Sequence, residues 1–257
     1  HRDLHSFPTR RSSDLVGFLF RNLYRLFAMI CLGGGENRFD RLWSRFRGML
    51  VYAFAQVRVV SEGFGVNHLL LFWGFMFLLL MNLEFLVSGV FPRLSFWFLG
   101  DIPYGAMLFM ADVMSVVVLV CVANAVIRRV FFRPAHIDPT VDAFVILGLV
   151  AALMIAYFGY HASEIRLGEK EIAPWTMPVS FLLAPLFEGM TPEDAHVTAR
   201  VFWWIHALVL LFFMNYLPYS KHIHILTAIP NIFFRSASFV TTVPRMIFRR
   251  GERFGVS

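Results

Sequence analysis

Four long apolar segments dominate this chain and restrict the folds that it can adopt. They run from Val66 to Phe91, from Ile102 to Ile127, from Val141 to Ala162 and from Ala199 to Leu217. An α-helix needs roughly 20 mostly apolar residues to cross the hydrocarbon core of a bilayer. The chain is 58% hydrophobic and only 16% charged, whereas soluble domains carry about 25% charged residues. We therefore predict an all-α integral membrane protein, a helical bundle with four full transmembrane helices.

The first fifteen residues need an interpretation of their own. Residues 1–15 read HRDLHSFPTRRSSDL and back-translate without a break into a string that looks like a common sequencing adapter. We predict that they are an assembly artefact and that the native sequence begins near Val16; a native arginine-rich leader is the alternative. Residues 16–65 then hold the stump of a truncated fifth span, from Val16 to Phe20, followed by a basic cytoplasmic amphipathic segment.

Basic residues are distributed unequally between the two sides of the predicted bundle. Sixteen flank the spans on one side: Arg21, Arg25, Arg38, Arg41, Arg45, Arg47, Arg58, Arg128, Arg129, Arg133, Lys221, Arg235, Arg245, Arg249, Arg250 and Arg253. The other side has four, namely Arg93, Arg166, Lys170 and Arg200. An excess of Lys and Arg marks cytoplasmic loops. We predict a multi-pass protein of a bacterial or archaeal cytoplasmic membrane with a cytoplasmic C-terminus. The basic residues that give the net charge of +6 lie between apolar runs. This distribution argues against a nucleic-acid partner.

Two apolar stretches do not read as spans. Residues from Arg38 to Val59 alternate apolar and basic side chains, which is typical of an amphipathic helix on the membrane surface. The stretch from Trp175 to Met190 is apolar, but Pro174, Pro178 and Pro185 interrupt it. We expect it to lie on the outer face or to re-enter the membrane in part.

Two cysteines and two acidic residues are further candidates for a functional role. Cys31 and Cys121 do not form a CxxC motif, so the chain has no local iron–sulfur, zinc or thiol-redox motif, and we expect both to be small buried apolar residues. Glu84 and Asp112 lie inside predicted spans. They serve either a proton path or quinone site, or only a buried polar neighbour.

Four histidines lie in or at the ends of the spans: His68, His161, His206 and His224. Ionisable residues at membrane depth are costly and usually functional, and imidazole is a common axial ligand of haem iron. Their depths predict an outer pair, His161 with His206, and an inner pair, His68 with His224. A single histidine at a helix end is more often an interfacial or hydrogen-bonded residue. The histidines that we place in loops and take as solvated are His136 and His196.

The spacing within the last span agrees with two stacked iron sites. His206 and His224 are 18 residues apart, which is five helical turns and about 27 Å. On one continuous helix they share a face, and His222 points about 160° away from His206. Pro218 can kink the helix between them.

Several motifs together resemble a known family. They are GENRFDR (35–41), GVNHLLLFWGF (65–75), the pair Arg128-Arg129, WWIHALVLLFF (203–213) and YLPYSKHIHILTAIPNIFF (216–234). They look like the membrane domain of the respiratory nitrate reductase gamma-subunit type. More closely, they resemble its version at the N-terminus of membrane iron–sulfur oxidoreductases related to heterodisulfide reductase. The resemblance covers nearly all of residues 16–257, and the last span with its tail is the most specific part.

The resemblance implies five spans, two b haems and exchange of electrons with menaquinone. His206 and His224 match the two ligands on the family's last helix, and His68 matches the first ligand on its second helix. Leu78 stands where the nitrate reductase pattern has another histidine. Either His161 replaces that ligand, or only one haem binds.

The resemblance also predicts the domain organisation. Residues 66–230 form a cytochrome b-type transmembrane bundle, and residues 231–257 form a cytoplasmic tail. GERFGV (251–256) resembles the linker into a ferredoxin-like domain and cysteine-rich reductase modules. The iron–sulfur clusters then belong to a missing C-terminal part, and we expect the chain to be a fragment at both ends.

The predicted function is electron transfer between a quinone pool in the lipid bilayer and a cytoplasmic iron–sulfur domain or flavoprotein. The chain is the membrane part of a quinone-linked oxidoreductase, with one or two b haems, quinone as substrate and no catalytic side chain of its own. The alternative is a haem-free membrane anchor that docks a soluble reductase. A small transporter ranks last, because internal repeats are lacking.

Overall fold

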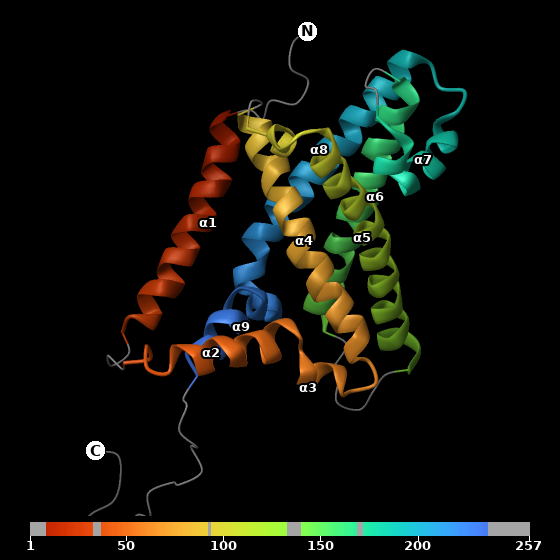
Figure 1. Cartoon of the computed structure of the whole chain (residues 1–257). Coiled ribbons are helices and arrows are strands. Elements are labelled where there is room, and N and C mark those ends of the chain that lie inside the picture. The colour runs from red at the N-terminus through yellow and green to blue at the C-terminus, as the bar shows by residue number, and fades with distance from the viewer. Residues whose placement is uncertain (1–8, 33–36, 92–93, 133–139, 169–171, 236–257) are drawn as a thin grey trace, which may run out of the picture.

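The computed structural model describes residues 9–32, 37–91, 94–132, 140–168 and 172–235. Within these ranges the chain is helical and contains no strand (Figure 1). The four longest apolar helices are α4 (Gly65–Val90), α5 (Asp101–Ile127), α6 (Val141–Leu167) and α8 (Pro192–Tyr216). Each is long and apolar enough to cross a membrane, which confirms the prediction of four such helices.

The four long helices run alternately up and down (Figure 1). Helix α4 packs on α5, α5 on α6, and α6 most extensively on α8. Gly159 permits that last contact, because a Cβ there would lie 2.6 Å from the Phe202 ring. Leu78, Val118 and Met154 belong to the shared apolar core. We call the end that carries the start of α4 the basic end, and the other the opposite end.

Two helices extend further than the sequence predicted. Helix α6 continues past Ala162 to Leu167 and stops at Gly168, whose φ is 66°. His161 therefore lies inside the helix, about a turn and a half before its end, and does not close it. Helix α8 begins at Pro192, where the Thr191 side chain accepts a hydrogen bond from the Asp194 amide. His196 consequently lies in the helix and not in a loop, whereas His136 lies outside the described residues.

The continuous helix expected from His206 to His224 is not present. Helix α8 ends at Tyr216, two 3₁₀ turns follow (Leu217–Tyr219 and Lys221–Ile223), and α9 (His224–Phe233) begins at His224 itself. Proline lacks the amide hydrogen that a continued helix needs, and Pro218 lies at this break. The prediction that the two histidines share one helix face was therefore wrong.

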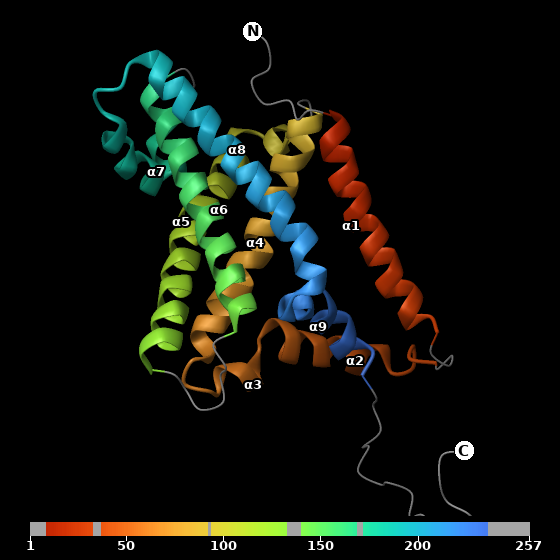
Figure 2. The ribbon, with the colours of Figure 1, turned by 180° about the vertical axis from the view of Figure 1, so that it is seen from behind.

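The basic segment lies across the basic end of the bundle (Figures 1 and 2). It is helical, as expected, but in three pieces: α2 (Leu42–Met49), a π-helical turn (Leu50–Phe54) and α3 (Val57–Val60). The break falls at Gln56, whose φ of 48° is left-handed. Trp43 on α2 is largely exposed, as a side chain facing the membrane interface would be.

Helix α1 (Thr9–Ile30) packs against α8. It includes residues 9–15 of the predicted artefact, and among the described helices it is not one of those apolar enough to count as a span. The truncated fifth span thus stays a prediction. Near the end of α1, Cys31 is exposed, so its predicted burial was wrong, whereas Cys121 is buried as expected.

The proline-rich stretch folds back against the bundle. It forms a 3₁₀ turn (Pro174–Thr176), α7 (Pro178–Leu183) and a second 3₁₀ turn (Ala184–Phe187), and these pack on α5 and α6. Helix α7 is tied to Asp112, which lies eleven residues into α5, about 16 Å along the helix axis. The segment therefore returns alongside the spans and does not only cover their ends.

Candidate functional site

The predicted inner pair of histidines comes together at the basic end. His68 lies in the first turn of α4 and His224 is the first residue of α9. Their ring centroids are 6.4 Å apart and their planes differ by 28°. Two imidazoles that bind one metal at about 2 Å each have centroids roughly 6.3 Å apart. Both rings are accessible, so a planar ligand can reach them from the side.

Hydrogen bonding prepares one of these rings for a ligand. His68 Nδ1 lies 2.9 Å from Gln56 Oε1. The amide oxygen only accepts, so Nδ1 donates and Nε2 keeps its lone pair. The described residues contain no group of three or more His, Cys, Asp or Glu side chains that could hold a metal ion. A haem iron requires only two protein ligands, and this pair fits that requirement.

Two buried nitrogen atoms at the basic end have no hydrogen-bond partner within the described part of the chain: Arg129 Nε and His222 Nδ1. Arg129 is close enough to His222 to contribute to lowering its pKa. The His222 and His224 rings are 5.8 Å apart. The nearest carboxylate to His222 belongs to Asp142, at 3.9 Å, and that carboxylate already accepts from Tyr216 Oη at 2.6 Å. Burial is the main cause that lowers the pKa of His222. The site therefore offers an anionic group the cationic donor Arg129 Nε, and His222 Nδ1 as a second donor in the tautomer that carries its proton there.

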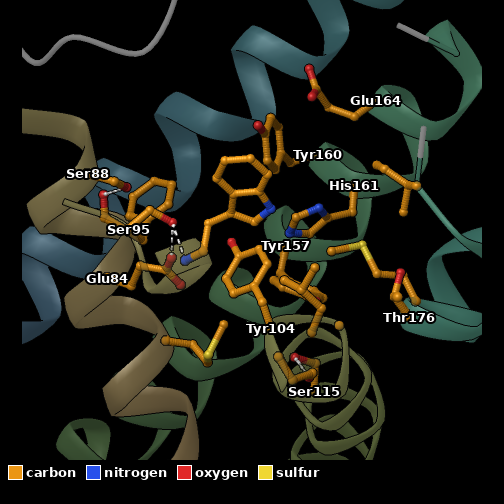
Figure 3. Close-up of a pocket in the computed structure, with 18 of the residues that line it drawn as sticks. Glu84, Ser88, Ser95, Tyr104, Ser115, Tyr157, Tyr160, His161, Glu164 and Thr176 are labelled. Carbon is orange, nitrogen blue, oxygen red and sulfur yellow. Dashed lines mark hydrogen bonds between the residues drawn. The ribbon is translucent and has the colours of Figure 1, made fainter. Parts of the chain in front are cut away.

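A cavity of about 810 Å³ lies toward the opposite end. Side chains of α4, α5, α6 and α8 and of the turn at Pro174–Thr176 line it. Figure 3 shows Tyr104 of α5 and Tyr157 and His161 of α6 converging on this space. Its size suits a drug-sized organic ligand.

The predicted outer pair lines this one cavity. His206 is buried, its Nδ1 donates to the Leu153 carbonyl at 3.1 Å, and its Nε2 lies 2.9 Å from Asn82 Oδ1. His161 packs its ring against Tyr157, with centroids 4.4 Å apart. The sequence analysis missed Asn82. Its polar side chain, one turn after Leu78 in an apolar helix, was a sign that this face of α4 contacts a polar group.

The two acidic residues inside spans have different surroundings. Glu84 lines the cavity and accepts a hydrogen bond from Ser95 Oγ at 2.6 Å (Figure 3). It also accepts one from the Phe96 amide at 2.8 Å. Asp112 instead holds the start of α7, so its structural reading is supported. Tyr157 Oη is buried and lacks a hydrogen-bond partner in the described ranges, which leaves one donor in the cavity wall for a ligand.

Comparison with known proteins found no matching family model and no matching solved structure. Two curated proteins are similar to the chain. The probable iron-sulfur-binding oxidoreductase FadF of Bacillus subtilis is 27% identical over 208 residues, which are 80% of this chain and 29% of that protein. The EtfAB:quinone oxidoreductase of Syntrophomonas wolfei is 28% identical over 254 residues, which are 93% of this chain and 34% of that protein.

The chain thus spans about a third of the length of the relatives that it matches. Both relatives are oxidoreductases, and the name of one includes quinone. Together with four helices that are able to cross a membrane, this similarity supports a general role in electron transfer at a membrane.

Proposed function

We propose that this chain is the membrane-embedded cytochrome b part of a quinone-linked oxidoreductase. It passes electrons between a quinone in the bilayer and an iron–sulfur or flavoprotein partner on the cytoplasmic side. The observation that carries the proposal is the separation of 6.4 Å between the His68 and His224 rings. These residues come from distant parts of the sequence, and their spacing suits two axial ligands of one iron.

The residues around the inner pair suit a b haem. His68 and His224 would hold the iron, and Arg129 Nε with His222 Nδ1 would donate hydrogen bonds to the propionates, since both atoms are buried without another hydrogen-bond partner among the described residues. Charge-assisted hydrogen bonds of this kind are the strong ones. When bound, the haem supplies a one-electron carrier whose potential depends on its ligands, hydrogen bonds and burial.

The cavity at the opposite end is the proposed place of quinone exchange. Its wall combines aromatic side chains with a few polar groups, as small-molecule sites usually do. The Tyr157 hydroxyl is available to donate to a quinone carbonyl, while Glu84 and His161 stand in the same wall as groups able to exchange protons. His161 and His206 remain the predicted ligands of a second haem in this space, and His206 would bind iron through Nε2 only by exchanging its contact with Asn82 for the metal.

The two sites lie at different depths. Asn82, which contacts His206, follows His68 by fourteen residues on α4, a rise of about 21 Å. Electrons that enter from quinone at the opposite end would therefore travel toward the basic end. The basic end is the predicted cytoplasmic side, where a soluble partner would receive or supply them.

The names of the two relatives support a role in a quinone-linked oxidoreductase. One is named as an iron-sulfur-binding oxidoreductase and the other as a quinone oxidoreductase. The matched region leaves out 71% of one relative and 66% of the other, because it covers 29% and 34% of them. We propose that iron–sulfur clusters reside in that remainder and exchange electrons with the inner haem of this chain.

The test is a dithionite-reduced minus oxidised spectrum of the purified chain, with haem counted per chain as the pyridine haemochrome. We expect b-type haem in the wild type and its loss at the inner site in His68→Ala and His224→Ala. His196→Ala in the first turns of α8 is the matched control and should keep all haem. Folded protein without any haem would leave the haem-free anchor.

The count decides how the outer cavity is used. Two haems per chain, with one lost in His161→Ala or His206→Ala, would support a second haem between these residues. One haem per chain that survives both substitutions would leave the cavity to quinone alone and would remove His161 and His206 from the set of ligands.

A further inference from the structure

Gln56 lies where the basic segment (residues 38–59) meets the bundle, and its backbone conformation is unusual. Its φ of 48° and ψ of 37° are left-handed, a conformation that is uncommon for residues other than glycine, asparagine and aspartate. It exposes only 5% of its surface. Strained backbone is retained where the surroundings or the function require it, so the contacts of Gln56 indicate what it is kept for.

The backbone of Gln56 begins α3. Its carbonyl oxygen accepts hydrogen bonds from the Val59 amide at 2.8 Å and the Val60 amide at 2.9 Å. Helix α3 in turn lies so close to α4 that a Cβ on Gly65 would be 1.7 Å from the Val59 carbonyl oxygen. The turn at Gln56 therefore places α3 in close contact with the first residues of α4, just before His68 in the sequence.

The side chain of Gln56 meets His68. Oε1 accepts from the Nδ1 hydrogen at 2.9 Å, which settles the tautomer of the imidazole and limits its rotation. Nε2 is then the one ring nitrogen of His68 left to bind a ligand, and the centroids of the His68 and His224 rings are 6.4 Å apart. A partner on the second ring nitrogen orients a metal-binding histidine and tunes its basicity.

We infer that Gln56 is a positioning residue that sets the tautomer of His68 and, through it, the redox potential of the inner haem; this role rests on the function proposed above. A neutral amide withdraws less of the Nδ1 proton than a carboxylate does, so it leaves His68 a weaker donor to iron. A haem held by His68 would thereby have a higher potential than one whose ligand had a carboxylate partner. Gln56 belongs to the basic segment, so this influence on the potential comes from outside the spans.

The test compares Gln56→Glu with Gln56→Leu in the full chain reconstituted in nanodiscs, with midpoint potentials from spectroelectrochemistry. The glutamate keeps an acceptor at the same reach and adds charge, so we expect the potential to fall. The leucine removes the acceptor, so we expect the potential to rise and haem affinity to drop about tenfold or more. A tenfold change in the ratio of reduced to oxidised haem corresponds to about 59 mV.

Asn124→Ala is the matched control. It removes a hydrogen bond to Asn67, the neighbour of His68 in sequence, without touching the His68 ring, and should leave the potential unchanged. Equal potentials in wild type, Gln56→Glu and Gln56→Leu, or shifts of the same sign in both variants, would overturn the inference while the cytochrome proposal stands.

A readout that does not need haem separates the two proposals. Nitrogen NMR of ¹⁵N-histidine in haem-free protein reports which ring nitrogen of His68 carries the proton. We expect Nδ1–H in the wild type and loss of this preference in Gln56→Leu. A wild-type ring without that preference would overturn the role of Gln56, whereas absence of haem in folded wild type would overturn the cytochrome proposal.

Discussion

The Ser180 hydroxyl donates a hydrogen bond of 2.6 Å to Asp112 Oδ1, and so ties the proline-rich segment to the interior of the bundle. The Val179 and Ser180 amides donate to the other carboxylate oxygen, at 2.6 and 3.2 Å. Asp112 is fully buried. One side chain thus satisfies the first turn of α7, whose amides lack partners within the helix.

Replacing Asp112 should loosen α7 more than it disturbs the rest of the bundle. Asp112→Ala leaves three donors without their acceptor, two of them on the buried Ser180, and we expect a loss of about 3 kcal/mol of stability. Limited proteolysis of the 172–187 segment and thermal unfolding in detergent would measure it. Glu193→Ala, an exposed acidic residue at the same end, should have little effect; equal sensitivity of the two variants would contradict the role of Asp112.

Arg45 connects the basic segment to α9. Its side chain is 5% exposed and donates to the Phe233 carbonyl at 3.2 Å and the Arg235 carbonyl at 2.6 Å. Arg45→Leu leaves these carbonyls without that donor, and we expect about 2–3 kcal/mol of destabilisation. Hydrogen exchange in α9 should become faster than in Arg47→Leu, an exposed neighbour on α2. Unchanged exchange in α9 would show that Arg45 does not hold it.

The pairing of Arg45 with Asp40 predicts that this contact depends on pH. The hydrogen bond from Arg45 holds the pKa of the Asp40 carboxyl below its ordinary value of 3.8. The folded state thus favours the ionised form, so the stabilisation is present above the ordinary pKa and is lost as the pH falls through the lowered one. The protection of the α9 amides against exchange, corrected for the intrinsic exchange rate at each pH, should fall on acidification below about pH 4. Asp40→Asn should abolish this dependence; a persistent one would assign it elsewhere.

Gly65 permits the close approach of α3 to α4. In Gly65→Ala the new Cβ would lie 1.7 Å from the Val59 carbonyl oxygen and 2.7 Å from the Val60 Cα, which are backbone atoms and cannot rotate away. We expect destabilisation of about 1–3 kcal/mol and a weakened contact between Gln56 and His68. Gly63→Ala is the control, since a Cβ there meets nothing within 4 Å. Equal unfolding temperatures of the two variants would contradict this packing.

Tyr157 should affect binding and stability in opposite directions. Its hydroxyl is buried without a hydrogen-bond partner in the described structure, so Tyr157→Phe should leave stability unchanged or raise it by about 1 kcal/mol. If the hydroxyl donates to quinone, binding of a short-chain naphthoquinone should weaken about tenfold. Tyr219→Phe, an exposed residue at the basic end, is the control for the titration. Unaltered binding in Tyr157→Phe would remove that hydroxyl from the proposed quinone site.

Sequence spacing predicted the individual helices well because each apolar run is a local property. The four segments between Val66 and Leu217 became α4, α5, α6 and α8, since a chain in a bilayer must satisfy its backbone hydrogen bonds within each spanning segment. The boundaries were less accurate. His161 and His196 lie inside helices because Gly168 and the Thr191 cap end and begin them beyond the apolar runs.

The candidate site depended on contacts between distant segments, which only the tertiary structure decided. Sequence reasoning paired His68 with His224 by depth, and the structure brings them together by a different route, through the break at Pro218 and the start of α9. It did not find Gln56 or Asn82, whose importance arises from what they touch. Local composition therefore determined the membrane class and the spans, whereas packing between helices decided which polar side chains meet, because such contacts depend on chain reversals that no local pattern encodes.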